Sequence, residues 1–207
     1  MRVKTYYVSK VGDVKISKNF RVKEFQCKDG TDKVLIDDDL VYKLQLIRDH
    51  FDKPLIITSG YRTPSYNAKV GGSPTSKHVK GMACDIRVNG IDPVLVGMYA
   101  ESIDSGGIGV YSYVNGFTHI DTRTTPYRWL QLTRTGGYEG LPKIMPTLGK
   151  NRSNIYSAVK LLQSKLDISQ SGTFGDYTES QVMKFQYAKG LTVDGLVGKA
   201  TWTALFS

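Results

Sequence analysis

The sequence predicts an α+β fold in two parts, and three observations support this prediction. Helix and strand patterns alternate within the first 122 residues. A stretch rich in glycine and proline, residues 136–146, then interrupts both patterns. Beyond it, one glycine-containing turn occurs twice, each time before a helical pattern. We therefore expect an α+β domain with a small antiparallel sheet over residues 1–142 and a three-helix domain over residues 143–207.

Apolar spacing and caps predict the helices of the first region. Aspartates at 37–39 precede apolar residues spaced by three and four positions, which is typical of a capped amphipathic helix: Leu40, Leu44, Ile47 and Phe51. Asp92 and Pro93 supply an N-cap and a first helical residue, so a second helix is expected to reach about Ile103. His50 falls at the end of the first helix, where a cationic imidazole suits the helix dipole, and we interpret it as structural.

Two segments predict strands of the small antiparallel sheet. Residues 55–58 form a short apolar run after Pro54 and indicate a buried strand. Residues 107–122 contain two β-rich runs joined by Asn115-Gly116, a pair that is typical of a hairpin turn. The second run of this hairpin contains His119.

Two of the three histidines lie near carboxylates in segments that indicate a metal site. His78 and Asp85 occur in one glycine-containing segment, and His119 lies in the predicted hairpin. Two imidazoles and one carboxylate suit a catalytic zinc, because three protein ligands leave the fourth tetrahedral position for water. Alternation in residues 82–88 directs Asp85 to a polar face and Cys84 to the core. Such groupings also arise by chance, so spacing alone leaves a structural role open.

Composition narrows the class of protein. The 207 residues are 40% hydrophobic and carry a formal charge of +9, which excludes a disordered chain and indicates an anionic partner. Apolar runs are too short to span a membrane, and the dispersed basic residues match no nucleic-acid motif. The first ten residues lack the apolar segment of a secretory signal, so we expect synthesis in the cytoplasm, where Cys27 and Cys84 stay free thiols.

A longer motif connects the candidate ligands. It consists of Ser59-Gly60-Tyr61-Arg62-Thr63-Pro64, Asn67, Ser76-x-His78-x-x-Gly81-x-Ala83-x-Asp85 and His119-Ile120-Asp121. Over roughly residues 18–135 the chain resembles peptidase family M15, the zinc D-alanyl-D-alanine carboxypeptidases, and especially its lysin-like branch. The resemblance implies that Zn²⁺ is bound by His78, Asp85 and His119. It also implies that Arg62 stabilises the oxyanion and that Ser76 helps to hold the substrate.

The sequence departs from this family pattern where the general base is expected. Many members carry a glutamate three residues, or a histidine two residues, before the third ligand, but here those positions are Gly116 and Phe117. Asp121 lies on the same strand face as His119, because the two residues are separated by one position. It is either the base that deprotonates the water or the partner that holds the imidazole of His119. The sequence leaves both roles open.

The second region contains an internal repeat. Gly172-Thr173-Phe174-Gly175-x-x-Thr178 recurs 23 residues later as Gly195-Leu196-Val197-Gly198-x-x-Thr201. Amphipathic patterns predict three helices, over residues 156–166, 177–189 and 200–206. Residues 153–205 resemble the three-helix peptidoglycan-binding domain, although Ser171 stands where the first loop usually has aspartate. We expect wall binding to belong to the module as a whole and Trp202 to pack in its core.

Together the two regions predict a zinc-dependent peptidoglycan hydrolase of the carboxypeptidase or endopeptidase type. Its expected partner is bacterial peptidoglycan, with anionic wall polymers as further candidates. Because synthesis in the cytoplasm is expected, it resembles a phage or prophage endolysin that acts on the wall after release. The alternative is a non-catalytic wall-binding protein with a structural zinc. A structural zinc usually has four protein ligands, so a site with three ligands and an open fourth position argues against this alternative. The sequence does not identify the bond that is cut.

Overall fold

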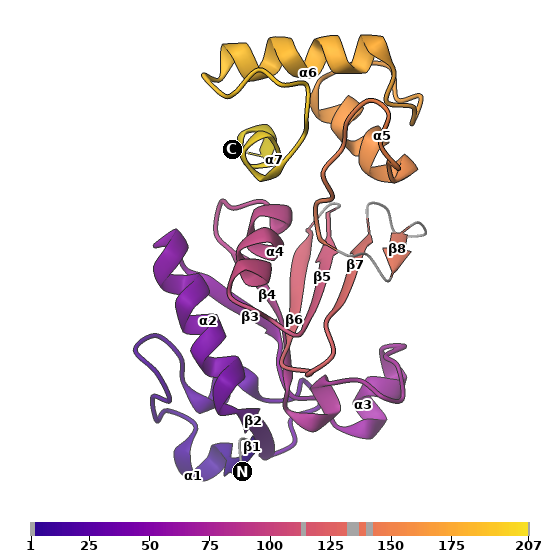
Figure 1. The fold of residues 1–207 in the computed structure, drawn as a ribbon. Coiled ribbons are helices and arrows are strands. Elements are labelled where there is room, and N and C mark those ends of the chain that lie inside the picture. The colour runs from indigo at the N-terminus through magenta and orange to yellow at the C-terminus, as the bar shows by residue number, and fades with distance from the viewer. Residues whose placement is uncertain (1–2, 113–114, 132–136, 140–142, 207) are drawn as a thin grey trace. The chain divides into compact units, whose positions relative to one another are not determined.

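The chain folds as two compact units. The computed structural model describes all residues except 1–2, 113–114, 132–136, 140–142 and 207. The units are Met1–Ile144 and Met145–Ser207 (Figure 1). Within the described residues, both sheets lie in the first unit and the second is built around three helices, so the predicted α+β class is confirmed. No helix of the described part is long and apolar enough to cross a membrane.

A six-stranded sheet forms the centre of the first unit. Its strands, in spatial order, are β3 (Leu55–Ser59), β4 (Ala83–Val88), β6 (Phe117–Asp121), β5 (Gly107–Tyr111), β7 (Tyr127–Gln131) and β8 (Gly137–Glu139). All neighbours are antiparallel except β5 and β7, which are parallel. The expected antiparallel sheet is therefore mixed. Both edges of β6 are already paired, so β7 reverses direction after β6 and pairs with β5 instead.

β8 lies within the glycine- and proline-rich stretch that the sequence indicates as a linker. Its backbone pairs with β7, from Gly137 opposite Gln131 to Glu139 opposite Trp129. The first part of this stretch therefore extends the sheet, because β7 offers an open edge whose backbone groups need partners.

Two helices pack on one face of this sheet, α2 (Asp38–Phe51) and α4 (Pro93–Ser102) (Figure 1). Both begin at the predicted caps: the side chain of Asp37 accepts from the backbone of Asp39, and that of Asp92 from Val94. The predicted core residues Leu40, Leu44 and Ile47 are buried. The ring of His50 stacks on Tyr99 of α4 at 3.7 Å between centroids, which gives this histidine a packing role.

Several short elements complete the first unit. A separate sheet pairs β1 with β2. In chain order, the short strands and helices are β1 (Val3–Tyr7), α1 (Val8–Val11), η1 (Val22–Phe25), β2 (Lys33–Asp37), α3 (Pro64–Lys69) and η2 (His78–Lys80). Cys27 and Cys84 are both buried and free, as expected. Burial raises the pKa of the Cys84 thiol, so it stays protonated in the core.

The second unit contains the three predicted helices, displaced by no more than one residue at each end. They are α5 (Tyr156–Lys165), α6 (Asp176–Ala188) and α7 (Lys199–Phe206). Trp202 is fully buried, its ring lies 6.2 Å from that of Phe206 between centroids, and its indole N–H donates to the carbonyl of Pro146 at 2.9 Å. The expected packing role of Trp202 fits this placement.

Two buried glutamines hold the repeated glycine turns. The side-chain oxygen of Gln163 accepts from the backbone of Gly172 at 2.8 Å, and its amide donates to Thr178 Oγ1 at 3.0 Å. Gln186, 23 residues later, repeats these contacts with Gly195 at 3.0 Å and Thr201 at 3.2 Å. Each turn is thus tied to the preceding helix through one side chain.

Ser171 has an equivalent role in the first turn to that of Asp194 in the second. The hydroxyl of Ser171 accepts from the Gln163 amide at 3.0 Å and from the backbone of Thr173 at 3.2 Å. A carboxylate oxygen of Asp194 accepts from the Gln186 amide at 2.8 Å and from the backbone N–H of Leu196. The serine that departs from the family pattern therefore preserves the hydrogen bonds of the turn.

Candidate metal centre and cleft

Two strands and one short helix position the candidate ligands. Asp85 on β4 and His119 on β6 are direct partners across an antiparallel pair, so their side chains lie side by side on one face of the sheet. Cys84 next to Asp85 is fully buried, and Thr118 next to His119 donates to the Pro93 carbonyl of α4, so these neighbours point to the helix-covered face. The predicted alternation on β4 agrees with this arrangement.

His78 reaches the same point from η2. This short helix is followed by Gly81 as its C-cap, which has a φ of 68°. A Cβ there would lie 2.4 Å from the carbonyl oxygen of Leu35, and the Gly81 carbonyl accepts from the backbone of Asp37. Only glycine allows both the left-handed conformation and this close approach. The glycine of the sequence motif therefore fixes the turn that carries His78.

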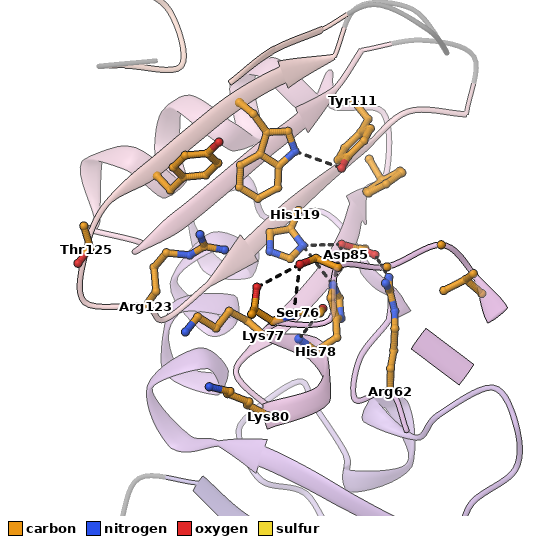
Figure 2. Close-up of a pocket in the computed structure, with 18 of the residues that line it drawn as sticks. Arg62, Ser76, Lys77, His78, Lys80, Asp85, Tyr111, His119, Arg123 and Thr125 are labelled. Atoms are coloured by element: carbon orange, nitrogen blue, oxygen red, sulfur yellow. Dashed lines mark hydrogen bonds and ion pairs between the residues drawn. The ribbon is translucent and has the colours of Figure 1, made fainter. Parts of the chain in front are cut away.

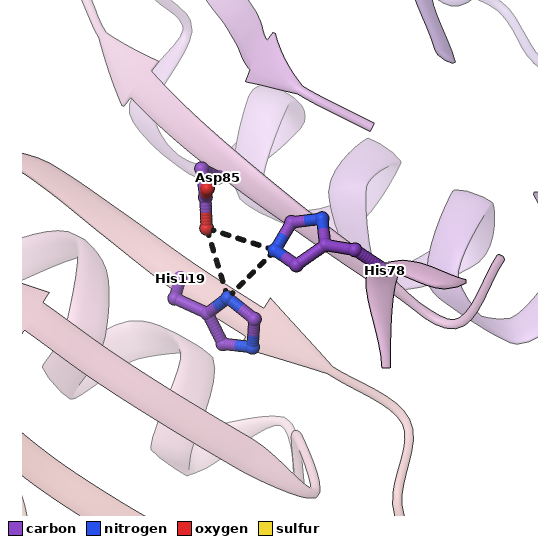
Figure 3. A group of neighbouring side chains, drawn as sticks. All are labelled: His78, Asp85 and His119. Atoms are coloured by element: carbon purple, nitrogen blue, oxygen red, sulfur yellow. Dashed lines mark hydrogen bonds and ion pairs between the residues drawn. The ribbon is translucent and has the colours of Figure 1, made fainter. Parts of the chain in front are cut away.

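The three side chains converge on one point, as Figure 3 shows. Nε2 of His78 lies 3.2 Å from Oδ1 of Asp85, and Nδ1 of His119 lies 2.8 Å from the same oxygen. The two imidazole nitrogens are 3.1 Å apart. All three residues are buried.

The outer nitrogens of both imidazoles have acceptor partners. Nδ1 of His78 lies 2.7 Å from the carbonyl oxygen of Gly60, and Nε2 of His119 lies 3.2 Å from Oδ2 of Asp121. A carbonyl and a carboxylate only accept, so both outer nitrogens donate, and in neutral imidazoles the inner nitrogens carry lone pairs. Two lone pairs and a carboxylate oxygen within about 3 Å repel one another unless a cation lies between them. The donor set therefore fits a zinc ion.

Arg62 holds the second oxygen of Asp85. Its Nη2 donates to Oδ2 of Asp85 at 2.5 Å and its Nε to the hydroxyl of Ser59 at 2.9 Å. Asp85, paired with Arg62, is thus an ionised candidate ligand: its Oδ2 contacts Arg62, and its Oδ1 faces the two imidazoles.

Asp121 lies on the outer side of the His119 ring. Its carboxylate is fully buried and accepts from Nε2 of His119, from the backbone of Gly107 at 2.8 Å and from the guanidinium of Arg123. Burial opposes its ionisation, but His119 and Arg123 lower the pKa of Asp121 below the usual range. The structure therefore places Asp121 beside the ligand cluster but away from the nitrogen that faces Asp85.

The cluster opens into a cleft of about 1010 Å³ (Figure 2). The predicted residues Arg62 and Ser76 line it together with the three ligands, whereas Asp121 does not. Ser76 is half-buried, and its hydroxyl accepts from the backbone of His78 at 3.3 Å. The cleft is further lined by residues of the loops at 70–77 and 123–126 and by four aromatic side chains, Tyr111, Phe117, Tyr127 and Trp129.

Trp129 and Arg123 are site residues that the sequence reasoning missed. The Trp129 ring lies 5.0 Å from that of His119, and a Cβ on Gly109 would lie 2.0 Å from it. Gly109 is the strand partner of both His119 and Trp129, so its missing side chain leaves the space in which the indole meets the imidazole. The two glycines at alternate positions of β5, Gly107 and Gly109, are the sequence signal that could have indicated this close approach.

Comparison with known protein families agrees with the two regions of the chain. Residues 18–121, half of the chain, match the peptidase M15 family, and residues 151–205 match the peptidoglycan binding domain family. The chain therefore belongs to peptidase family M15 and carries a C-terminal peptidoglycan-binding domain, as its motifs predict.

Curated relatives match a shorter segment. The probable peptidoglycan L,D-endopeptidase MepK of Haemophilus influenzae is 39% identical over 71 residues, which are 32% of this chain and 38% of the relative. The peptidoglycan L,D-endopeptidase MepK of Escherichia coli is 37% identical over 75 residues, 34% of this chain and 41% of the relative. The matched segment thus spans about two fifths of the length of these relatives.

Proposed function

We propose that the protein is a zinc-dependent peptidoglycan hydrolase that cleaves a peptide bond in the stem peptide or cross-link of the bacterial wall. The observation that carries this proposal is the convergence of two imidazole lone pairs and one ionised carboxylate at the floor of a large cleft. Three ligands that open into a cleft favour a catalytic site over the alternative, a wall-binding protein with structural zinc. The names of the relatives favour an endopeptidase over a carboxypeptidase.

The side chains around the cluster have separable roles in this proposal. Zinc held by the three ligands would supply a Lewis acid and lower the pKa of a water at the site. Arg62 fixes the carboxylate of Asp85 and directs a guanidinium at the cleft, where it would stabilise negative charge on the carbonyl oxygen of the substrate. Ser76 holds the backbone of His78 and offers its hydroxyl to the substrate from the cleft wall.

We assign Asp121 the orienting role rather than that of general base. Its carboxylate is fully buried and contacts the outer nitrogen of His119, so it fixes which nitrogen remains for the metal. Among the described residues that line the cleft, Asp85 is the only one with a carboxylate. The proposal therefore leaves the general base unassigned.

The C-terminal domain would hold the enzyme on peptidoglycan, and the basic charge of the chain would favour anionic wall polymers as well. The endolysin-like context, with synthesis in the cytoplasm and action on the wall after release, is part of the same proposal. Expression in bacteria with and without a pore-forming lysis protein tests it, because lysis that requires the pore is the expected result.

Digestion of purified walls tests the enzymatic proposal. Wild-type protein should release soluble fragments, and mass spectrometry of their new termini identifies the bond. His78→Ala should release none while still sedimenting with the walls through the C-terminal domain. A wild-type protein that binds the walls and releases nothing, with zinc added, would support the non-catalytic alternative instead.

A further inference from the structure

The cleft has an unequal distribution of charge. Its described lining includes four cationic side chains, Arg62, Lys77, Lys80 and Arg123, and the single carboxylate of Asp85. Arg62 and Asp85 form an ion pair, so they compensate each other. Figure 2 shows Lys77, Lys80 and Arg123 on one side of the imidazoles and Arg62 on the other. We call these three residues the cationic arm of the cleft.

Arg123 is held in place within this arm. The carboxylate of Asp121 accepts from its Nε at 2.8 Å and from its Nη2 at 2.5 Å. Its guanidinium also lies over the rings of Tyr127 and Trp129, 5.5 Å and 5.9 Å from their centroids. Only 26% of the side chain is exposed. Because these contacts already fix the guanidinium, Arg123 would lose little side-chain conformational entropy when it binds an acceptor.

The two lysines add positive charge that the described part of the chain does not compensate. Lys77 precedes His78 and Lys80 ends the same short helix, so both stand at the mouth of the metal centre. Neither ammonium group forms an ion pair with a described residue. Asp121, the acid behind Arg123, is already shared with His119. A cleft of this kind attracts an anion.

We propose that the cationic arm binds a carboxylate of the substrate peptide beside the scissile bond, so that the protein selects an acidic stem peptide over its amidated counterpart. A carboxylate suits this arm because a fixed guanidinium donates in plane and the two ammonium groups add point charges. The rings of Tyr127 and Trp129 next to Arg123 provide an apolar wall for the aliphatic part of the same residue. The inference rests on the proposed function for its reaction.

Binding measurements on the full chain test this proposal without requiring turnover. Two cross-linked stem peptides of one sequence are used, one with its side carboxyl groups free and one with these groups amidated. By calorimetry, the free acid should bind about twofold to fivefold more tightly to wild-type protein. Lys77→Gln/Lys80→Gln should reduce this preference, because only Arg123 of the arm remains. Equal affinities of the two peptides for wild-type protein would overturn the proposal.

Lys53→Gln/Lys69→Gln is the matched control, because it also removes two positive charges and both lysines are exposed and lie outside the cleft. This variant should keep the preference for the free acid. If it lost the preference, the effect would come from overall charge and the proposed carboxylate site would be wrong. The zinc content of the Lys77→Gln/Lys80→Gln variant shows that the fold is intact. In kinetic assays, the Lys77→Gln/Lys80→Gln variant should show a higher KM for the free acid and an unchanged kcat.

The two proposals fail separately. A protein that prefers the free acid but cleaves neither peptide contradicts the hydrolase and retains the carboxylate site. Conversely, cleavage of both peptides with equal KM retains the hydrolase and overturns the carboxylate site.

Discussion

The carboxylate of Asp121 contacts Nε2 of His119, the ring nitrogen on the opposite side from the Nδ1 that faces Asp85. This pair determines the tautomer of His119, because the carboxylate accepts the only proton of the neutral imidazole. Arg123 and the backbone of Gly107 hold the carboxylate in turn. This contact supports the proposed orienting role of Asp121, which acts on metal affinity.

Asp121→Asn should therefore weaken zinc binding by about 10- to 100-fold, because the amide is a poorer partner for the imidazole N–H. Wall-lysis activity should fall with it and return in part when zinc is added in excess. Zinc titration and lysis rate are measured on the same variant. If zinc binding stayed intact while turnover fell by about 100-fold or more, Asp121 would be the general base after all.

His78→Ala should lose the metal. Wild-type protein should contain about one equivalent of zinc, since one cluster of three ligands is present in the described residues. His50→Ala is the control, because its ring stacks on Tyr99 and is not part of the cluster. Elemental analysis of the purified variants should show zinc retained in His50→Ala and strongly reduced in His78→Ala. Undiminished zinc in His78→Ala would contradict the ligand assignment.

Gly109→Ala should displace Trp129 from His119, because the added methyl group would lie 2.0 Å from the indole ring. We expect a loss of about 1 to 3 kcal/mol in the free energy of unfolding of the first unit, together with lower activity. Gly175→Ala, whose Cβ meets nothing within 4 Å, is the matched control. Chemical denaturation followed by tryptophan fluorescence distinguishes the two variants. Equal stability of both would show that the indole has other space to occupy.

Residues 143–207, expressed alone, should fold and sediment with peptidoglycan without releasing fragments. They contain the compact unit Met145–Ser207 and none of the candidate metal ligands. Sedimentation with purified walls, followed by analysis of the supernatant, checks both parts of the prediction. A fragment that stays in solution with walls in excess would show that the domain does not anchor the protein.

Gln163→Leu should destabilise the C-terminal domain by about 1 to 3 kcal/mol, because the backbone N–H of Gly172 and the hydroxyl of Thr178 lose a buried partner. Gln170→Leu, at an exposed position of the same segment, should have little effect. Urea denaturation of the isolated domain measures both. Similar midpoints for the two variants would mean that the first turn does not depend on the glutamine.

Local patterns account for the parts of the fold that were predicted. The caps at Asp37 and Asp92 and the alternation around Asp85 act over a few residues, so the sequence displays them directly. The candidate ligands His78, Asp85 and His119 were suggested by their residue types and assigned through the resemblance to the family motif, and the structure brings the three together. The offset of 23 residues between the glycine turns also indicated the equivalence of the two halves of the C-terminal domain, although not the glutamines that hold them.

Contacts between distant segments account for what was missed. Trp129 meets His119 only because β7 pairs in parallel with β5, and no local pattern encodes that pairing. Arg123 resembles any surface arginine in the sequence, and only the folded chain shows its guanidinium held between Asp121 and two aromatic rings. The assignment of Asp121 stayed open for the same reason, since strand alternation gives the face of a residue but not which ring nitrogen it reaches.

Asp85 and His119 face each other across a hydrogen-bonded strand pair, whereas much of the rest of the cleft wall comes from the loops at 70–77 and 123–126. In the proposed function, the hydrolytic chemistry and the choice of substrate would therefore depend on different parts of the backbone. Loops tolerate insertion and replacement far better than paired strands do. Under the proposed function, exchange of these loops for those of a wall hydrolase with a different target would redirect cleavage to another bacterial wall, while two of the three candidate metal ligands keep their scaffold.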